Sequence, residues 1–191
     1  LKTIIAVIFF VTYAFAKEPS GTCKSPLPSM TNLQIPQFFK DSWFVTYILG
    51  GSNEATCRKY DTRMEGGLIK LNADGYYTIQ GQKKFYTTTC SSTSGVGLNP
   101  AGPFVLKCRH TYDAKNNIFF DLKLSVIETD YSGYALVYRC TSYDAPLNLI
   151  SGNLVILQRN KQTDGSKATA SSASLKKSEW SLKQFTKTTG C

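Results

Sequence analysis

Cysteine and histidine are the residues of this chain that could hold a structural zinc ion. The chain has six cysteines, none in a C-x-x-C pair, and one histidine, His110. A structural zinc site needs Cys and His ligands grouped at short spacings, so we predict no metal site. An even number of cysteines is instead typical of disulfide bonds formed on the secretory route. The sequence alone does not choose the pairing among Cys23, Cys57, Cys90, Cys108, Cys140 and Cys191.

Nucleophilic catalysis by a serine is the second chemistry that these residue types could allow. It requires a serine, a histidine and an acidic residue in contact, and many such enzymes place the serine in a G-x-S-x-G turn. The chain contains no such turn, and His110 has no sequence neighbour that suggests this role. We therefore predict a binding protein rather than an enzyme, and we expect no cofactor.

The start of the chain has the pattern of a secretory signal peptide. Lys2 precedes an apolar run from Ile4 to Val11, and Ala14-Phe15-Ala16 matches a cleavage site. The run is too short to cross a bilayer, which needs about 20 apolar residues. We predict a signal peptide at residues 1–16 and a secreted single domain at residues 17–191.

The chain carries a positive charge. Its 22 basic residues against 13 acidic ones give a formal net charge of +9, and loss of Lys2 with the signal peptide would leave +8. A basic segment near the C-terminus could steer acidic ligands or anionic surfaces, or simply keep the protein soluble. Nucleic acid is a poor partner for a secreted chain. The basic residues of that segment are Lys161, Lys167, Lys176, Lys177, Lys183 and Lys187.

Short β-patterns separated by turn residues fill most of the chain. In one of them Phe120, Leu122, Leu124 and Val126 alternate with polar residues, which predicts an antiparallel strand with one buried face. The turn Asn72-Ala73-Asp74-Gly75 predicts a short hairpin. The predicted strands are residues 43–49, 67–71, 76–79, 85–90, 104–112, 118–128, 133–143 and 153–159.

A sheet of this size must bury its apolar face against something. Only Ser174–Lys187 has a helical pattern, with Leu175, Leu182 and Phe185 on one face and Trp180 opposite. One helix does not cover such a sheet, so we expect the strands to close on themselves. The predicted fold is all-β, an eight-stranded antiparallel up-and-down barrel with one C-terminal α-helix. Such a barrel either fills itself with side chains or holds one small ligand.

Three sequence blocks carry a family resemblance. Asp41-Ser42-Trp43, Thr129-Asp130-Tyr131 and Arg159 resemble the blocks of the lipocalins. The resemblance implies that Arg159 packs across Trp43 at the closed end of a lipocalin barrel, with Asp130 in a neighbouring turn. One position departs from the family, because Asp41 stands where a glycine is usual.

The likeness extends to a narrower group. Residues 38–46, Cys57-Arg58-Lys59-Tyr60, residues 86–90, residues 95–100 and residues 157–161 resemble salivary lipocalins of blood-feeding triatomine bugs. Among these the chain is similar to the pallidipin, triplatin and dipetalodipin group of platelet-aggregation inhibitors. The resemblance implies the bridges Cys23 to Cys140 and Cys57 to Cys191, which leaves Cys90 with Cys108. It also implies secretion into saliva as a monomer.

Related nitrophorins hold haem through a histidine. Their ligand lies on an earlier strand, near residues 67–77 here, and that segment has no histidine. We therefore expect His110 to be a surface or hydrogen-bonded strand residue.

The group resemblance implies that the barrel sequesters a lipid mediator, a thromboxane or related prostanoid. Its apolar part would lie among aromatic residues, and its carboxylate would meet a cation. Arg58, on the second strand, is the first choice and Arg139 is the rival. Tyr138 and Gln158 could meet hydroxyl or ether oxygens, and Tyr47 is a further candidate. A charge-assisted hydrogen bond would contribute roughly 1.5–3 kcal/mol.

Two alternatives stay open. The protein could bind a host haemostatic protein, such as thrombin or a contact-pathway factor, through its basic tail and the loop Ser91–Pro103. It could also scavenge biogenic amines, which would require inward carboxylates. Asp61, Glu65 and Glu128 flank the strands and are the candidates for that role.

Overall fold

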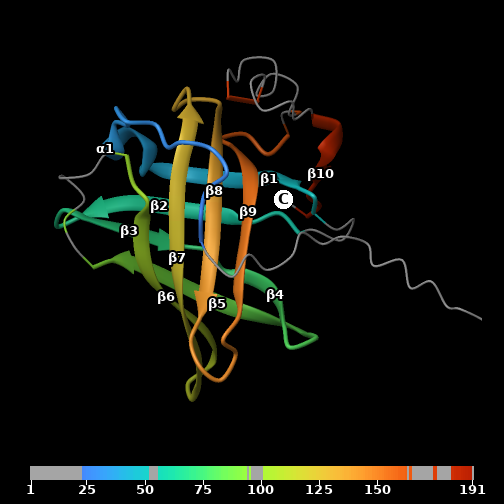
Figure 1. The fold of residues 1–191 in the computed structure, drawn as a ribbon. Coiled ribbons are helices and arrows are strands. Elements are labelled where there is room, and N and C mark those ends of the chain that lie inside the picture. The colour runs from blue at the N-terminus through green and yellow to red at the C-terminus, as the bar shows by residue number, and fades with distance from the viewer. Residues whose placement is uncertain are drawn as a thin grey trace, which may run out of the picture.

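β-strands make up most of the computed structural model, which describes residues 23–51, 56–93, 95, 101–162, 164, 174–175 and 182–190. The predicted signal peptide lies outside these residues. One short helix precedes the strands (Figure 1). The elements are α1 (Ile35–Phe38), β1 (Asp41–Leu49), β2 (Lys59–Glu65), β3 (Leu68–Asn72), β4 (Gly75–Ile79), β5 (Gln82–Ser92), β6 (Phe104–Asp113), β7 (Asn116–Thr129), β8 (Tyr134–Tyr143), β9 (Ile150–Gln158), η2 (Leu182–Gln184) and β10 (Phe185–Lys187).

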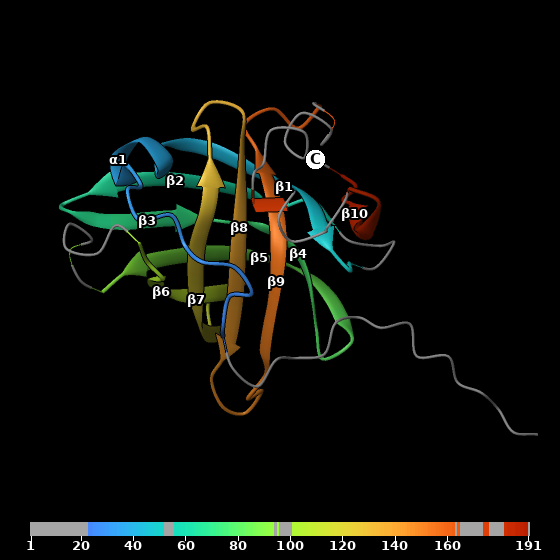
Figure 2. The ribbon, with the colours of Figure 1, turned by 45° about the horizontal axis from the view of Figure 1, so that its top comes forward.

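The strands close into a barrel. They pair in the order β1-β2-β3-β5-β6-β7-β8-β9, and β9 pairs with β1. Every one of these pairings is antiparallel. Figure 2 shows β7, β8 and β9 crossing in front of the strands β1 to β5. The predicted eight-stranded antiparallel barrel is therefore confirmed.

Two details of the strand prediction are wrong. The stretch Asn72–Gly75 is not a hairpin turn, because β3 and β4 both pair with β5 and form one interrupted side of the barrel. The tight turn is Gln80-Gly81, where both residues have positive φ, 52° and 75°, as a two-residue hairpin requires. The predicted runs also omitted β2, whose sequence is rich in charged residues.

The barrel interior forms the main hydrophobic core. Along β7, Phe120, Leu122, Leu124 and Val126 are all buried in this cluster. This confirms the alternation that predicted one buried face. The same cluster includes Trp43 and aliphatic residues from β1, β3, β6, β8 and β9.

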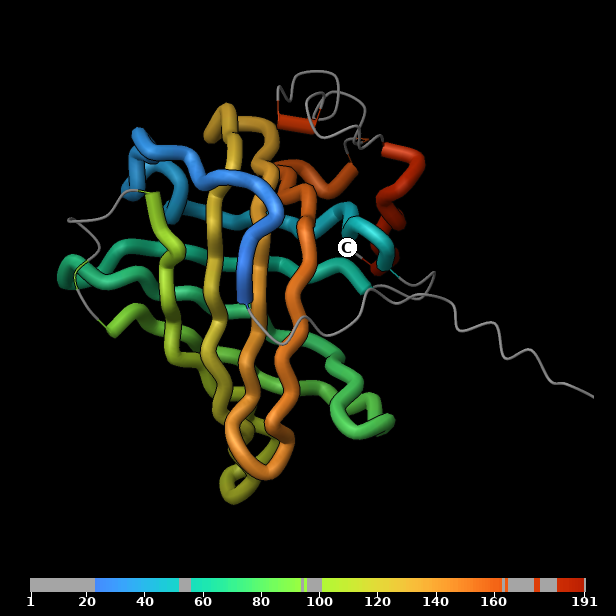
Figure 3. The backbone as a smooth tube through the Cα atoms, viewed as in Figure 1, coloured from blue at the N-terminus to red at the C-terminus, as the bar shows by residue number. Residues whose placement is uncertain are grey.

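A second cluster lies on the outside of the barrel. It contains Tyr47 of β1, Tyr138 of β8 and Ile156 of β9, together with Leu175 and Phe185 from the C-terminal part. Cys23 and Leu27 pack against it, and Figure 3 shows the first described residues running along the outside of β7 and β8. Both ends of the described chain therefore pack against the outer face of β1, β8 and β9.

The predicted helix Ser174–Lys187 is only partly present. Ser174 and Leu175 are helical, whereas Leu182–Gln184 is a 3₁₀ turn and Phe185–Lys187 is strand β10, paired with β1. A strand forms here because the edge of β1 next to residues 47–49 offers backbone partners. Trp180 and the other residues between these elements lie outside the described part. No helix within the described residues has the length and apolar character of a membrane span.

Two disulfides match the pairing that the resemblance implies. Cys23 is bonded to Cys140 on β8, and Cys90 on β5 is bonded to Cys108 on β6. Cys57 is also disulfide-bonded, and its expected partner Cys191 lies outside the described residues. The bridge to Cys23 holds the N-terminal segment against the outer cluster.

Trp43 and Arg159 close the end of the barrel next to α1. Trp43 is 1% exposed, and its Nε1 donates a hydrogen bond to the carbonyl of Phe38 at 2.8 Å. The guanidinium carbon of Arg159 lies 3.6 Å from the ring centroid of Trp43, as the lipocalin blocks imply. The carboxylate of Asp130 accepts hydrogen bonds from the backbone of Gly133 and Tyr134, at 2.7 and 2.8 Å, and so fixes the turn between β7 and β8.

Candidate functional site

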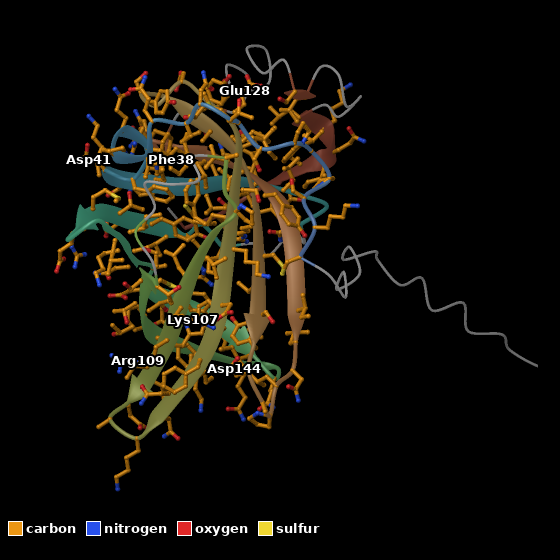
Figure 4. All side chains as sticks on the ribbon, turned by 60° about the vertical axis from the view of Figure 1, so that its left-hand side comes forward. Phe38, Asp41, Lys107, Arg109, Glu128 and Asp144 are labelled. Carbon is orange, nitrogen blue, oxygen red and sulfur yellow. A yellow bond between two sulfur atoms is a disulfide. The ribbon has the colours of Figure 1, made fainter. Side chains whose placement is uncertain are left out.

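A cavity of about 570 Å³ lies inside the barrel. Its walls come from β2 to β9, and the turn between β8 and β9, with Pro146 and Leu147, lines its mouth. Figure 4 shows Asp144 of this turn far from Phe38 and Asp41, which lie at the closed end. The cavity therefore opens at the end opposite to Trp43. Its volume is typical of ligand pockets, which span about 300–1,000 Å³.

Arg58 brings one positive charge into the cavity. It lies directly before β2, and its guanidinium carbon is 3.8 Å from the ring centroid of Tyr77. The guanidinium also donates a hydrogen bond to the carbonyl of Tyr76. Burial lowers the pKa of Arg58, and the nearby charge of Arg139 lowers it further. An anion beside this group would relieve both effects.

Gly75 makes room for this guanidinium. Its φ is +154°, and a Cβ at this position would lie 2.9 Å from Nη1 of Arg58. Gly75 was predicted to lie in a hairpin turn. In the structure it instead allows the guanidinium of Arg58 to lie close to the backbone.

Arg139 on β8 brings the second positive charge. Its Nη1 donates to the hydroxyl of Tyr60 at 2.9 Å, and its Nε donates to Oδ1 of Asn153 at 2.8 Å. Neither Arg58 nor Arg139 forms a salt bridge with any residue of the described part. No carboxylate lies among the described residues that line the cavity. The cavity is thus a positively charged, partly apolar compartment.

His110 belongs to an aromatic wall of the same cavity. It is fully buried, its ring lies 4.4 Å from that of Phe120, and its Nδ1 is 2.7 Å from Oγ1 of Thr88. Its Nε2 is 3.1 Å from the hydroxyl of Tyr143. Burial, with a contribution from Arg58, lowers the pKa of His110 to about 4. His110 is therefore neutral near pH 7 and adds polarity without charge.

The lowered pKa of His110 predicts how stability depends on pH. The unfolded chain binds a proton at His110 near pH 6.5 and the folded chain only near pH 4, so the unfolding free energy falls as the pH drops between these values. The pKa difference corresponds to a loss of about 3 kcal/mol. Urea denaturation between pH 4.5 and pH 7 measures this loss.

The matched variant for this test is His110→Phe, which cannot titrate. We expect its stability to be lower at pH 7, because Thr88 and Tyr143 lose their partner, and nearly flat across the same pH range. An equal slope in both proteins would contradict the assignment to His110. Asp61 and Asp113, whose pKa values are also lowered, act mainly below this window.

The structure brings only two of the five predicted ligand-binding residues into the cavity. Arg58 and Arg139 line it, but Tyr47, Tyr138 and Gln158 do not. Tyr47 and Tyr138 belong to the outer cluster. Gln158 is buried elsewhere, where its Oε1 accepts from Thr46 at 2.7 Å and its Nε2 donates to the carbonyl of Asp164 at 3.0 Å. The structure therefore does not place these three side chains on the wall of this cavity.

Several cavity residues were not predicted from the sequence. Tyr60, Tyr77 and Tyr143 place phenol groups around the two arginines, and His110 lies behind them. The alternation Leu106, Cys108, His110 along β6 was the available signal, since all three are buried on the inner face. His110 has both ring nitrogens within hydrogen-bonding distance of side chains, which agrees with the expected hydrogen-bonded strand residue.

Of the residues proposed for the two alternative functions, none of the described ones lines the cavity. Asp61 pairs with Lys59 at 2.9 Å, Glu65 pairs with Arg63 at 3.0 Å, and Glu128 accepts from the hydroxyl of Tyr134 at 2.7 Å. None of these acids lines the cavity. Much of the loop Ser91–Pro103 and of the basic tail lies outside the described residues. The part of the chain that is described contains no group of three or more His, Cys, Asp or Glu side chains able to hold a metal.

Comparison with known sequences gives a consistent set of relatives. A family model described as Triabin matches residues 14–172. Triafestin-2 of Triatoma infestans is 34% identical over 164 residues, which cover 84% of this chain and 79% of the relative. Triplatin of the same species is 30% identical over 85% of this chain and 82% of its own length. Pallidipin of Meccus pallidipennis is 28% identical over 85% of this chain and 83% of its own length.

Solved structures with the same fold include two kinds of ligand complex. The LTC4 complex of LTBP1 has a TM-score of 0.60 and 23% identity, covering 91% of this chain and 96% of that one. The tryptamine complex of the amine binding protein of Rhodnius prolixus has a TM-score of 0.61 and 20% identity, covering 85% of this chain and 84% of that one. At these identities the likeness concerns the fold.

Proposed function

The chain belongs to the Triabin family, and from this membership and its cation-lined cavity we propose that it is a secreted salivary lipocalin that sequesters an eicosanoid. Removal of a thromboxane or related prostanoid would inhibit platelet aggregation and vasoconstriction. The relatives are proteins of triatomine bugs, and the LTBP1 structure shares the fold with a bound leukotriene.

The observation that carries the proposal is the charge of the cavity. Arg58 and Arg139 line it without any carboxylate from the described residues. A carboxylate ligand would accept charge-assisted hydrogen bonds from a guanidinium, worth roughly 1.5–3 kcal/mol. An amine would instead meet two like charges.

The remaining wall suits the other half of such a ligand. Leu71, Phe120 and Leu122 supply apolar surface, while the hydroxyls of Tyr60 and Tyr143 lie near the cations. An eicosanoid combines one carboxylate with a long hydrocarbon chain and a few oxygen atoms. The cavity wall contains both apolar and charged residues, which favours this amphipathic class over small polar anions.

Calorimetric titration tests the proposal with three ligands that differ in charge. We expect a stable carboxylate mimic of thromboxane A2 to bind, its methyl ester to bind at least tenfold more weakly, and tryptamine to give no heat. A lack of heat with the carboxylate, or binding of tryptamine, would overturn the proposal. In platelets, we expect inhibition of aggregation induced by collagen or arachidonate but not by ADP.

A further inference from the structure

A second concave surface lies on the outside of the barrel. It is a groove of about 400 Å³ over β2, β3, β5 and β6, with Phe119 of β7 at one side. Four cations line it: Arg63, Lys70, Lys107 and Arg109. We call these four side chains the basic groove. Figure 4 shows Lys107 and Arg109 along the same strand, away from the closed end.

The strand register places three of these cations in one row. Arg63 is directly opposite Lys70, Lys70 is opposite Ser91, and Ser91 is opposite Lys107. Neighbouring strands are about 4.8 Å apart, so the row runs across four strands as a line of positive charge. Arg109 lies two residues from Lys107 and extends the groove along β6.

The charge of the basic groove is only partly compensated. Arg63 pairs with Glu65 at 3.0 Å and Lys107 pairs with Asp121 at 2.7 Å, both in exposed contacts. Lys70 donates to the hydroxyl of Ser91 at 2.9 Å, and neither Lys70 nor Arg109 forms a salt bridge within the described residues. These two ion pairs leave two of the four cations without a carboxylate partner, and the carboxylate of Asp144 also acts on Lys107.

Sheet stability does not account for this arrangement. Like charges placed directly opposite each other in a ladder are destabilising, and Arg63 and Lys70 are such a pair. Phe119, at the side of the groove, is 54% exposed. Clustered cations are the feature by which proteins bind polyanions such as heparin, and the open ring of Phe119 adds an apolar surface beside them.

We propose that the basic groove binds a sulfated polysaccharide of the extracellular matrix or cell surface. Sulfate groups along an extended chain complement the row Arg63, Lys70 and Lys107. The hydroxyl of Ser91 accepts from Lys70 at 2.9 Å and donates to the carbonyl of Ser92 at 3.2 Å, so it holds Lys70 in this row. The polysaccharide binds outside the barrel, so the cavity stays free for its own ligand. Polysaccharide binding would hold the protein near the surfaces at which lipid mediators are released.

The test uses the full chain and a heparin decasaccharide in calorimetry at several salt concentrations. The double variant Lys70→Ala with Arg109→Ala removes the two unpaired cations. We expect it to bind about tenfold more weakly at physiological salt, and its plot of log Kd against log salt to lose about two units of slope. The matched control is Lys24→Ala with Lys40→Ala, which removes the same charge from exposed positions elsewhere.

The competing outcomes are distinct. Equal weakening in both double variants would overturn the groove, because net charge alone would then explain binding. Comparable affinity for poly-glutamate would point to an acidic polypeptide as the partner. Comparable binding to phosphatidylserine vesicles would point to a membrane surface. Each result contradicts the polysaccharide assignment. Thermal denaturation confirms that both variants fold, and titration of the eicosanoid mimic should be unchanged in both.

Discussion

Replacement of Arg58 by Met is expected to weaken binding of an eicosanoid carboxylate by about 10- to 100-fold, the effect of losing one charge-assisted hydrogen bond. Met keeps much of the apolar stem but removes the guanidinium above Tyr77. The methyl ester should lose little affinity in the same variant, because it has no charge to lose. Calorimetry with both ligands measures the difference.

Arg139 should contribute less than Arg58. Its guanidinium already donates to Tyr60 and Asn153, so fewer of its hydrogens are available to a ligand. We expect Arg139→Met to weaken the carboxylate by a smaller factor, whereas Lys83→Met on the outside should have no effect. Gly75→Ala should mimic Arg58→Met in part, because the added Cβ displaces the guanidinium. A reversed ranking of the two arginines would contradict this assignment of the carboxylate position.

The family blocks were predictable because each meets a specific backbone or packing requirement. Asp41 stands where the family usually has glycine, and its φ is +59°, in the left-handed region that glycine adopts most easily. The Trp43 and Arg159 contact follows from the same blocks. The barrel itself followed from alternation along the strands and the shortage of helices.

The side to which single residues point was harder to predict. Alternation has a period of two, so an error of one residue reverses the face, and Arg139 faces the cavity while Tyr138 faces outward. The implied bridge from Cys23 to Cys140 was a usable signal, since Tyr138 shares the face of Cys140. Tyr47 gave no such signal. A bulge between Val45 and Tyr47 breaks the alternation of β1, and the sequence pattern does not reveal it.

Replacement of Arg159 by Ala is expected to destabilise the closed end strongly. Besides stacking on Trp43, its guanidinium donates hydrogen bonds to the backbone carbonyls of Lys40 and Ser42 at 2.6 and 3.1 Å. It also donates to the carbonyls of Gln37, Phe38 and Tyr131. One side chain thus joins α1, β1 and the turn between β7 and β8. A stacking contact of about 0.5–2 kcal/mol together with these bonds suggests a loss of roughly 3 kcal/mol.

Chemical denaturation of Arg159→Ala and Arg159→Lys separates the geometry of this group from its charge. Lysine keeps the charge but not the planar fork that reaches several carbonyls, so we expect it to recover only a small part of the lost stability. Full recovery by lysine would show that charge alone matters. Because Arg159 lies at the end opposite the cavity mouth, eicosanoid affinity of the folded variants should stay at the level of the unmodified protein. A large change in affinity would mean that the closed end also shapes the cavity.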